Sequence, residues 1–113
     1  MYGVRGANAD TLAAEAALRV GAGVVTLAVP ERIYPVLAAK LTEVMVMPVP
    51  DEGTGRFGGL KALESALALA AQADAVLIGP GLGRAAETSE FVRLFAADVK
   101  APLVMDADAI YAF

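Results

Sequence analysis

Short apolar runs alternate with longer amphipathic segments along this chain. Residues 10–20 contain good helix formers throughout, with Asp10 placed to cap the first turn and Gly21 placed to end the helix. Residues 24–29 then form a β-branched apolar run between a glycine and a proline, which is typical of a strand buried on both faces of a sheet. The pattern therefore predicts a helix followed by a buried strand.

The same cycle of helix and strand recurs three more times. Further helices are predicted from residue 30 to about residue 40, along 60–70 and around 91–95, and further strands at 44–47, 75–78 and 103–105. In the helix along 60–70, the residues expected on the buried face are Leu60, Leu63, Leu67 and Ala70. Residues 51–59 are polar and rich in glycine, so we expect an exposed loop there.

Strands that alternate with helices through short connections favour right-handed crossovers. We therefore expect an α/β fold, a three-layer α/β/α sandwich with a mainly parallel sheet. The chain opens on a glycine-rich segment and a helix, whereas doubly wound domains usually open on a strand and have more covering elements. We interpret residues 1–113 as a single partial domain that is cut at both ends. Uncovered sheet edges and apolar faces would then favour self-association, so we expect a homo-oligomer.

Charge and composition exclude several classes of function. The chain has 113 residues with 9 Lys and Arg against 13 Asp and Glu, a net charge of −4, so no basic face is expected for a nucleic acid. Cys and His are both absent from the sequence, which excludes disulfides, thiolate nucleophiles, imidazole bases and imidazole metal ligands. The chemistry that remains uses carboxylates, hydroxyls, backbone amides, Lys and Arg.

The apolar content does not indicate a membrane protein. Although 58% of residues are hydrophobic, much of the excess is alanine, and the longest charge-free stretch, residues 20–30, contains glycines and a proline. A membrane helix needs roughly 18 or more apolar residues, and the N-terminal residues lack the charged start and apolar block of a secretory signal. We expect a cytoplasmic protein without a membrane partner.

A glycine-rich segment follows the predicted strand at 75–78. In open α/β sheets, ligands bind beyond the carboxyl ends of the strands. The segment 79–84 (GPGLGR) has three glycines that let the backbone approach a ligand and leave amides free near the next helix, which suits an anion or a phosphate. A turn that simply needs glycine is an equal alternative, because no Lys-Ser or Lys-Thr pair follows to make a P-loop.

Two carboxylates, Asp106 and Asp108, follow the last predicted strand. In an extended segment both side chains would point the same way, whereas at a helix start Asp108 becomes a cap and only Asp106 faces the cleft. Both readings stay open for Asp108. Asp106 is the stronger candidate, as a partner for Mg²⁺ or for a ligand hydroxyl, because hard cations prefer carboxylate oxygens.

Three other segments are interpreted mainly as structural. The opening residues 3–9 precede a predicted helix and are either a further ligand-lining segment or a frayed terminus. Residues 87–90 (ETSE) are assigned to helix capping and to the preference for acidic residues in a first turn. Met45, Met47 and Met105 alternate with valine in apolar runs, so we expect them in the core.

A set of segments, taken together, resembles one protein family in order and spacing. The segments are Ala13-Ala14, Gly21-Ala22-Gly23-Val24-Val25-Thr26, Val29-Pro30-Glu31, Gly79-Pro80-Gly81-Leu82-Gly83-Arg84 with Glu87-Thr88, and Asp106-Ala107-Asp108-Ala109-Ile110. They are similar to the ATP/ADP-dependent NAD(P)H-hydrate dehydratases, which have a ribokinase-like fold. The resemblance covers nearly the whole chain.

The resemblance implies a carbon–oxygen lyase that repairs the S epimer of hydrated NADH or NADPH. A nucleotide, ATP or ADP with Mg²⁺, phosphorylates the hydroxyl on the nicotinamide ring, and loss of phosphate restores the cofactor. By position, Ala9 and Gly83 correspond to residues that contact the substrate, and Gly79, Gly81 and Asp106 would line the same cleft.

The resemblance also implies that parts of the family's site lie outside this chain. The leading strand with its Gly-Gly-Ser would precede residue 1. The Pro-His, Lys-Gly-x-x-Thr and Gly-Gly-Thr-Gly-Asp segments, the last with the catalytic Asp, would follow residue 113. We therefore expect no catalytic residue in these 113 residues, no nucleotide site, and no turnover by the isolated chain.

Two alternatives remain open. A related ribokinase-like kinase of a small molecule would share the fold and the glycine-rich segment, although the combination of GPGLG with DADA weighs against it. A non-catalytic nucleotide-binding or assembly module would have kept the front half of the fold. Turnover by the purified chain alone would exclude the second alternative.

Overall fold

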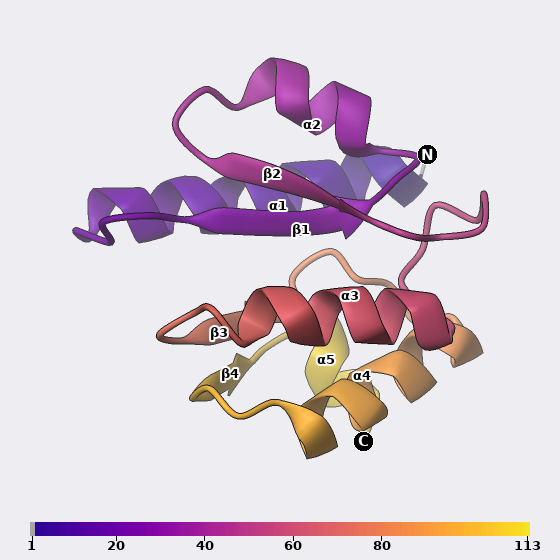
Figure 1. Ribbon diagram of the computed structural model, residues 1–113. Helices are drawn as coiled ribbons and strands as arrows, with labels where there is room; N and C mark the ends of the chain where they lie inside the picture. Colours follow the sequence, from indigo (N-terminus) through magenta and orange to yellow (C-terminus); the bar gives the residue numbers. More distant parts are fainter. Residues whose placement is uncertain (1) are drawn as a thin grey trace.

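Helices and strands alternate along the whole described chain. The computed structural model describes the backbone of residues 2–113 and the side chains of residue 9 and residues 11–113. Its elements, in chain order, are α1 (Tyr2–Arg19), β1 (Thr26–Pro30), α2 (Tyr34–Lys40), β2 (Met45–Val49), α3 (Leu60–Ala70), β3 (Val76–Ile78), α4 (Ala86–Asp98), β4 (Leu103–Met105) and α5 (Asp108–Tyr111). The predicted α/β alternation is confirmed (Figure 1).

The strands form two separate small sheets. β1 pairs with β2 in parallel, from Thr26 opposite Met45 to Pro30 opposite Val49. β3 pairs in parallel with β4, with Ile78 opposite Met105. The predicted parallel pairing is therefore confirmed. The prediction of one continuous sheet is not met within residues 2–113, because the described hydrogen bonds join the strands only in these two pairs.

The first helix begins earlier than predicted and ends as predicted. α1 starts at Tyr2, so Asp10 lies within it and the prediction that Asp10 caps the helix is wrong. At the other end, Gly21 has a φ of 102°, and its amide donates to the carbonyl of Leu18 at 3.1 Å. The amide of Ala22 donates to the carbonyl of Ala17 at 3.2 Å. These paired bonds around a left-handed residue are a Schellman motif, which explains why the helix ends here.

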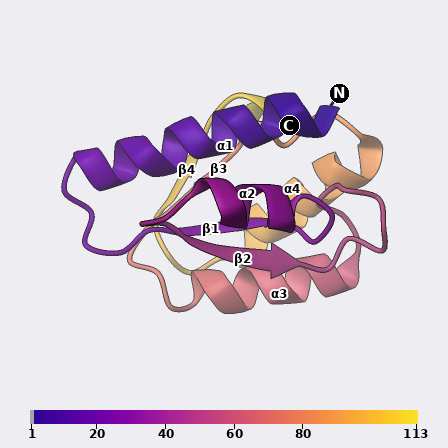
Figure 2. The same ribbon diagram turned by 90° about the horizontal axis from the view of Figure 1, so that it is seen from above.

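Helices lie on both faces of the first sheet. Leu27 and Val46 pack with residues of α1 and α2, whereas Val49 joins the core cluster that contains α3. Viewed from above, α1 and α3 lie on opposite sides of β1 and β2 (Figure 2). This half of the chain therefore has the layered arrangement that the sequence pattern predicts.

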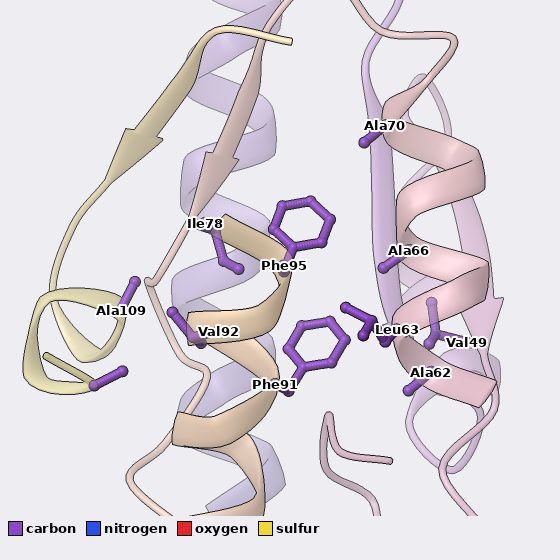
Figure 3. Close-up of a cluster of buried hydrophobic side chains, with 11 residues drawn as sticks. Val49, Ala62, Leu63, Ala66, Ala70, Ile78, Phe91, Val92, Phe95 and Ala109 are labelled. Carbon is purple, nitrogen blue, oxygen red and sulfur yellow. The ribbon is translucent and has the colours of Figure 1, made fainter. Parts of the chain in front are cut away.

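The main core lies between α3 and α4. Figure 3 shows Phe91 and Phe95 of α4 directed toward α3; their ring centroids are 5.9 Å apart. On α3 the buried residues are Ala62, Leu63, Ala66 and Ala70. Leu60 is 69% exposed, so its predicted place on the buried face is wrong. The small alanines let the aromatic rings approach α3. The buried face of the helix is therefore centred on these alanines and does not include Leu60.

The strands are less buried than predicted. Leu77 and Val104 stand opposite each other on one face of the second sheet, and they are 51% and 59% exposed. Met45, Met47 and Met105 are 56%, 36% and 37% exposed, so their assignment to the core is wrong. Within residues 2–113 no helix packs over Leu77 and Val104, which leaves an apolar sheet face open to solvent.

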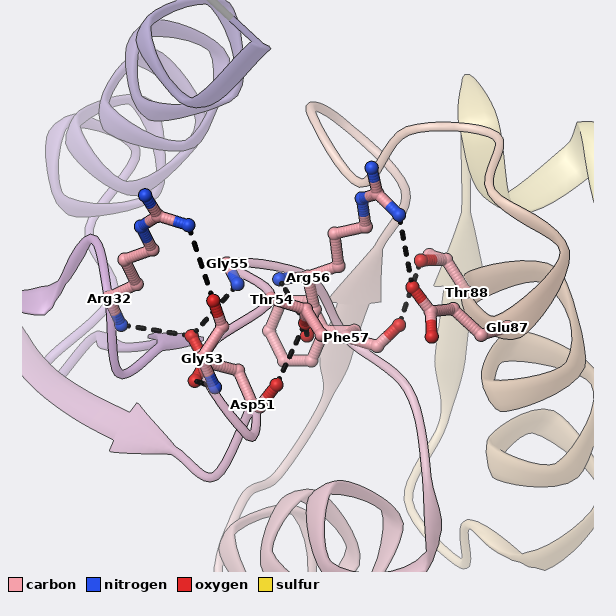
Figure 4. Close-up of polar contacts among 9 residues, drawn as sticks. All are labelled: Arg32, Asp51, Gly53, Thr54, Gly55, Arg56, Phe57, Glu87 and Thr88. Atoms are coloured by element: carbon pink, nitrogen blue, oxygen red, sulfur yellow. Dashed lines mark hydrogen bonds and ion pairs between the residues drawn. The ribbon is translucent and has the colours of Figure 1, made fainter.

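A buried carboxylate organises the loop between β2 and α3. The side chain of Asp51 accepts hydrogen bonds from the amides of Arg32 (3.0 Å), Gly53 (2.8 Å) and Gly55 (3.2 Å) (Figure 4). The residue is only 4% exposed. Because Arg32 lies just before α2, these bonds join the end of β2 to the segment that leads into α2. The loop at 51–59 is thus exposed along most of its length, as predicted, but is anchored by one buried side chain.

The same loop is attached to α4. The hydroxyl of Thr88, which is fully buried, donates to the carbonyl of Phe57 at 2.8 Å. Arg56 pairs with Glu87 at 3.2 Å on the surface. The capping role predicted for residues 87–90 is therefore wrong: the N-cap is Ala85, without a side-chain hydrogen bond. Glu87 does lie in the first turn, where a negative charge favours the helix dipole.

We expect Asp51→Ala to lower the free energy of unfolding by about 2–4 kcal/mol, because it leaves three partly buried backbone amides without their acceptor. Urea unfolding followed by circular dichroism measures the change. Asp74→Ala is the control, since Asp74 is exposed and its side chain makes no hydrogen bond within the described residues. Equal urea midpoints for the two variants would contradict the anchoring role of Asp51.

Candidate functional site

Two turns lie side by side at the carboxyl edge of the second sheet. The first, residues 79–84, follows β3, and the second, residues 106–107, follows β4. The amide of Asp106 still donates to the carbonyl of Ile78 at 3.0 Å, so the two turns diverge only beyond this bond. This edge is where ligands bind in open α/β sheets, which makes it the candidate site.

The glycines of the first turn are required by its backbone. The amide of Leu82 donates to the carbonyl of Gly79 at 3.2 Å, with Pro80 and Gly81 at the central positions and a φ of 78° at Gly81. That is the geometry of a type II turn, which needs glycine at its third position. Gly83 also has a positive φ, 87°. The turn is thus built by proline and glycine chemistry.

Gly79 lies against the backbone of the second turn. Its φ is 136°, and a Cβ atom built on it would overlap the carbonyl oxygen of Asp106. Only a residue without a side chain fits this approach. Gly79 and Asp106, both predicted to line one cleft, are therefore brought into contact through their backbones.

Asp108 fixes the end of the glycine turn. One carboxylate oxygen, Oδ2, accepts the amide of Gly83 at 2.7 Å, and the other, Oδ1, accepts Nε of Arg84 at 3.1 Å. The Arg84 guanidinium also lies over the ring of Tyr111, 4.5 Å from its centroid. Asp108 and Tyr111 both belong to α5, so this short helix holds the glycine turn from one side.

The observed contacts change two sequence predictions. Asp108 is not a helix cap, because the N-cap position is Ala107 and no side-chain bond caps α5. The amide of Gly83 is not free for an anion, because a carboxylate already accepts it. The amide of Gly81 has no hydrogen-bond partner within the described residues. Sequence reasoning missed the contact of Asp108 with the turn, although the basic Arg84 in a segment facing two carboxylates was a signal for it.

The other predicted site residues differ in how far the structure places them. Asp106 is exposed, and its carboxylate makes no hydrogen bond or ion pair within residues 11–113. Ala9 lies half-buried on α1, which packs on the first sheet, so its place in the same site stays a prediction. The side chains of the other residues in the opening segment 3–9 lie outside the described part of the chain.

The described residues build no metal cage. No three Asp or Glu side chains in the described part of the chain are gathered closely enough to hold a metal ion. A groove of about 200 Å³ between α3 and α4 is lined in part by Leu60, Glu87, Glu90 and Leu94, and none of the predicted site residues lines it. Across the described residues, no helix is both long and apolar enough to cross a membrane.

We expect Gly79→Ala to destabilise the protein by at least about 2 kcal/mol, because the added methyl group overlaps a backbone atom and the φ is unfavourable for an L residue. Thermal and urea unfolding measure the loss. Gly23→Ala is the matched control: a Cβ there meets nothing within 4 Å and its φ is not positive. Similar stability of the two variants would contradict the close approach of Gly79 to Asp106.

Comparison with known proteins identifies the family. The family model described as NAD(P)H-hydrate dehydratase matches residues 2–113. The chain is 47% identical over 109 residues to the bifunctional NAD(P)H-hydrate repair enzyme Nnr of Salinibacter ruber, a match that covers 94% of this chain and 20% of that protein. It is 44% identical over 105 residues to the Nnr enzyme of Moorella thermoacetica, with 93% of this chain and 20% of that protein covered.

A shorter relative matches as well. The ADP-dependent (S)-NAD(P)H-hydrate dehydratase of Xanthomonas campestris is 35% identical over 104 residues, which covers 91% of this chain and 35% of that protein. The chain thus spans about a fifth of the length of the Nnr relatives and about a third of the length of this dehydratase. The resemblance drawn from the glycine and DADA segments is confirmed, and the chain belongs to the NAD(P)H-hydrate dehydratase family.

Proposed function

We propose that this chain is part of an ATP- or ADP-dependent (S)-NAD(P)H-hydrate dehydratase, a carbon–oxygen lyase that repairs hydrated NADH or NADPH. The observation that carries the proposal is the family match over residues 2–113. It is supported by the meeting of the two turns, with Gly79 against Asp106, at the ligand-binding edge of a parallel sheet. The activity itself belongs to the whole protein, of which this chain supplies part of the substrate site.

The proposed residues have distinct tasks in that site. Gly79, Gly81 and Gly83 keep the turn compact and free of side chains, so the hydrated nicotinamide ring can approach the backbone closely. Asp106 presents an exposed carboxylate that can accept a hydrogen bond from a hydroxyl of the hydrated substrate. Ala9 is proposed as a further substrate contact. The catalytic Asp and the nucleotide site are proposed to lie in other segments of the whole protein.

The nucleotide supplies the chemical driving force in this proposal. Its phosphoryl group is transferred to the hydroxyl of the hydrated ring; the C–O bond then breaks, phosphate leaves, and a proton is lost from the neighbouring ring carbon as the ring double bond is restored. Mg²⁺ is commonly held by one or two carboxylates together with substrate phosphates. Asp106 is the candidate carboxylate on this chain, but the described residues do not form a metal cage by themselves. No step is therefore assigned to the metal here.

We also infer that the two sheets are parts of one mainly parallel sheet in a ribokinase-like three-layer sandwich. Both pairs are parallel, and the apolar side chains of Leu77 and Val104 are exposed where such a sandwich places a covering layer. Apolar side chains exposed outside that face, such as Val36 on α2, support the proposal of a homo-oligomer. Sedimentation of the native gene product tests this: assembly is expected, and a monodisperse monomer would contradict it.

The direct test uses the native gene product that contains this sequence. Its intact mass is determined first, and it is then mixed with hydrated NADH and either ATP or ADP. We expect the near-ultraviolet absorbance of NADH to recover only when a nucleotide is present. An inactive product that still binds the hydrate would support a non-catalytic module instead, and nucleotide-dependent phosphorylation of another small molecule would support the kinase alternative.

We expect Asp106→Asn to lower kcat/KM for hydrated NADH by about tenfold or more, because it removes the charge that is proposed to bind the substrate hydroxyl or the metal. A continuous absorbance assay at varied concentrations of hydrated NADH measures kcat and KM. Asp74→Asn makes the same chemical change at an exposed position before β3 and should leave both constants unchanged. Equal kcat/KM values for the two variants would remove Asp106 from the site.

A further inference from the structure

We propose that Asp108 is a positioning residue of the substrate site, which holds the glycine turn in its binding shape without touching the substrate. The proposal rests on the proposed function, because it assigns a role within that site. Its basis is the pair of bonds that one carboxylate makes to consecutive residues of the turn, Gly83 at 2.7 Å and Arg84 at 3.1 Å.

Both carboxylate oxygens of Asp108 are engaged by the turn. The side chain is only 22% exposed, and the short bond to Gly83 is that of a carboxylate accepting a backbone amide. A substrate group would have to displace the amide of Gly83 or the guanidinium of Arg84 to reach either oxygen. Asp108 therefore acts through the turn, in contrast to the free carboxylate of Asp106.

The turn is held at both of its ends by the segment after β4. At its start, Gly79 lies against the carbonyl of Asp106, and at its end Gly83 is bound by Asp108. Between these points only the single bond from Leu82 to Gly79 closes the type II turn. Loss of the Asp108 bond would release the half of the turn that contains Gly81 and Gly83, both of which have a positive φ.

The backbone between the two carboxylates is strained in a way that fits this role. Ala107 has a φ of 49° and a ψ of −121°, a conformation that L residues adopt rarely. Such strain costs about 1–3 kcal/mol and persists only where the surroundings impose it. Here it reverses the chain immediately after β4, so that the next residue, Asp108, reaches back to the turn that follows β3.

Arg84 supplies a second, weaker contact with the same helix. Its guanidinium lies over Tyr111, one helical turn after Asp108, but its side chain is 63% exposed. An exposed pair of this kind contributes little by itself. The partly buried bond to Gly83 is therefore the one on which the proposal depends, and Arg84→Ala should have a smaller effect than Asp108→Ala.

The test combines a structural and a kinetic measurement on the native gene product. Hydrogen–deuterium exchange resolved at the amide of Gly83 reports the bond itself, and we expect Asp108→Ala to speed this exchange by about tenfold or more. In the absorbance assay, KM for hydrated NADH should rise by at least about tenfold, and misplacement of the turn by about 1 Å can cost as much as roughly 100-fold in rate. KM for the nucleotide should stay unchanged, because the proposed nucleotide site lies elsewhere.

Two further variants separate positioning from general stability. Asp108→Asn keeps an oxygen acceptor for the Gly83 amide. Its Gly83 exchange rate and its KM for the hydrate should therefore be closer to those of the unmodified protein than to those of Asp108→Ala. Asp74→Ala is the control, because it removes an exposed carboxylate that makes no hydrogen bond within the described residues, so it should leave both KM values and the exchange of the Gly83 amide unchanged. The proposal is overturned if the Gly83 amide exchanges equally fast in Asp108→Ala and the unmodified protein, or if its exchange speeds up while KM for the hydrate does not change.

Failure of the proposed function gives a different result. If the unmodified native product restores no NADH with either ATP or ADP, the proposed function is wrong, and the positioning role, which rests on it, is wrong as well. If the unmodified product is active, and Asp108→Ala has the same KM for the hydrate and the same Gly83 exchange rate as the unmodified protein, the proposed function stands and only the positioning role is wrong.

Discussion

The buried carboxylate of Asp51 is the interaction on which the rest of the structure depends. It accepts three backbone amides from two separate segments, and so fixes the path of the chain as it leaves β2. That path brings the ring of Phe57 against that of Phe91, with the centroids 5.2 Å apart, and presents the Phe57 carbonyl to the buried Thr88. The first half of the chain is thus positioned against α4, which in turn packs beside the strands that lead to the candidate site.

In the candidate site, too, a carboxylate accepts a backbone amide from a segment that is distant in sequence. A carboxylate from one turn binds the backbone of a neighbouring turn, because glycine-rich segments have no side chains with which to hold themselves in place. A carboxylate is suited to this task since it accepts several donors at once and its bonds to amides are shorter and stronger than neutral ones. The geometry of the glycine turn is consequently a property of two segments that are distant in sequence.

Periodicity and turn residues were sufficient to predict the order of the elements and several of their ends, but not the helix starts, where the capping roles predicted for Asp10 and residues 87–90 were wrong. The strand at 75–78, the helix end at Gly21 and the glycine turn at 79–84 were all predicted, because each depends on residues that are neighbours in sequence. Features that depend on distant partners were missed. Asp108 was weighed as a helix cap since nothing near it in sequence indicates Gly83, and the burial of the strands was overestimated because exposure depends on which elements cover a sheet.

The arrangement of the strand pairs also bears on how the chain folds. Each sheet is formed by strands that are consecutive in the sequence and are joined through one helix, α2 between β1 and β2 and α4 between β3 and β4. Parallel strands joined through a whole helix make non-local contacts, whose loop-closure entropy is lost before the pairing contributes stability, so such pairs form slowly. Val49 of β2 lies in the same core cluster as α3 and α4, so the first strand pair reaches its full packing only when the second half of the chain folds against it.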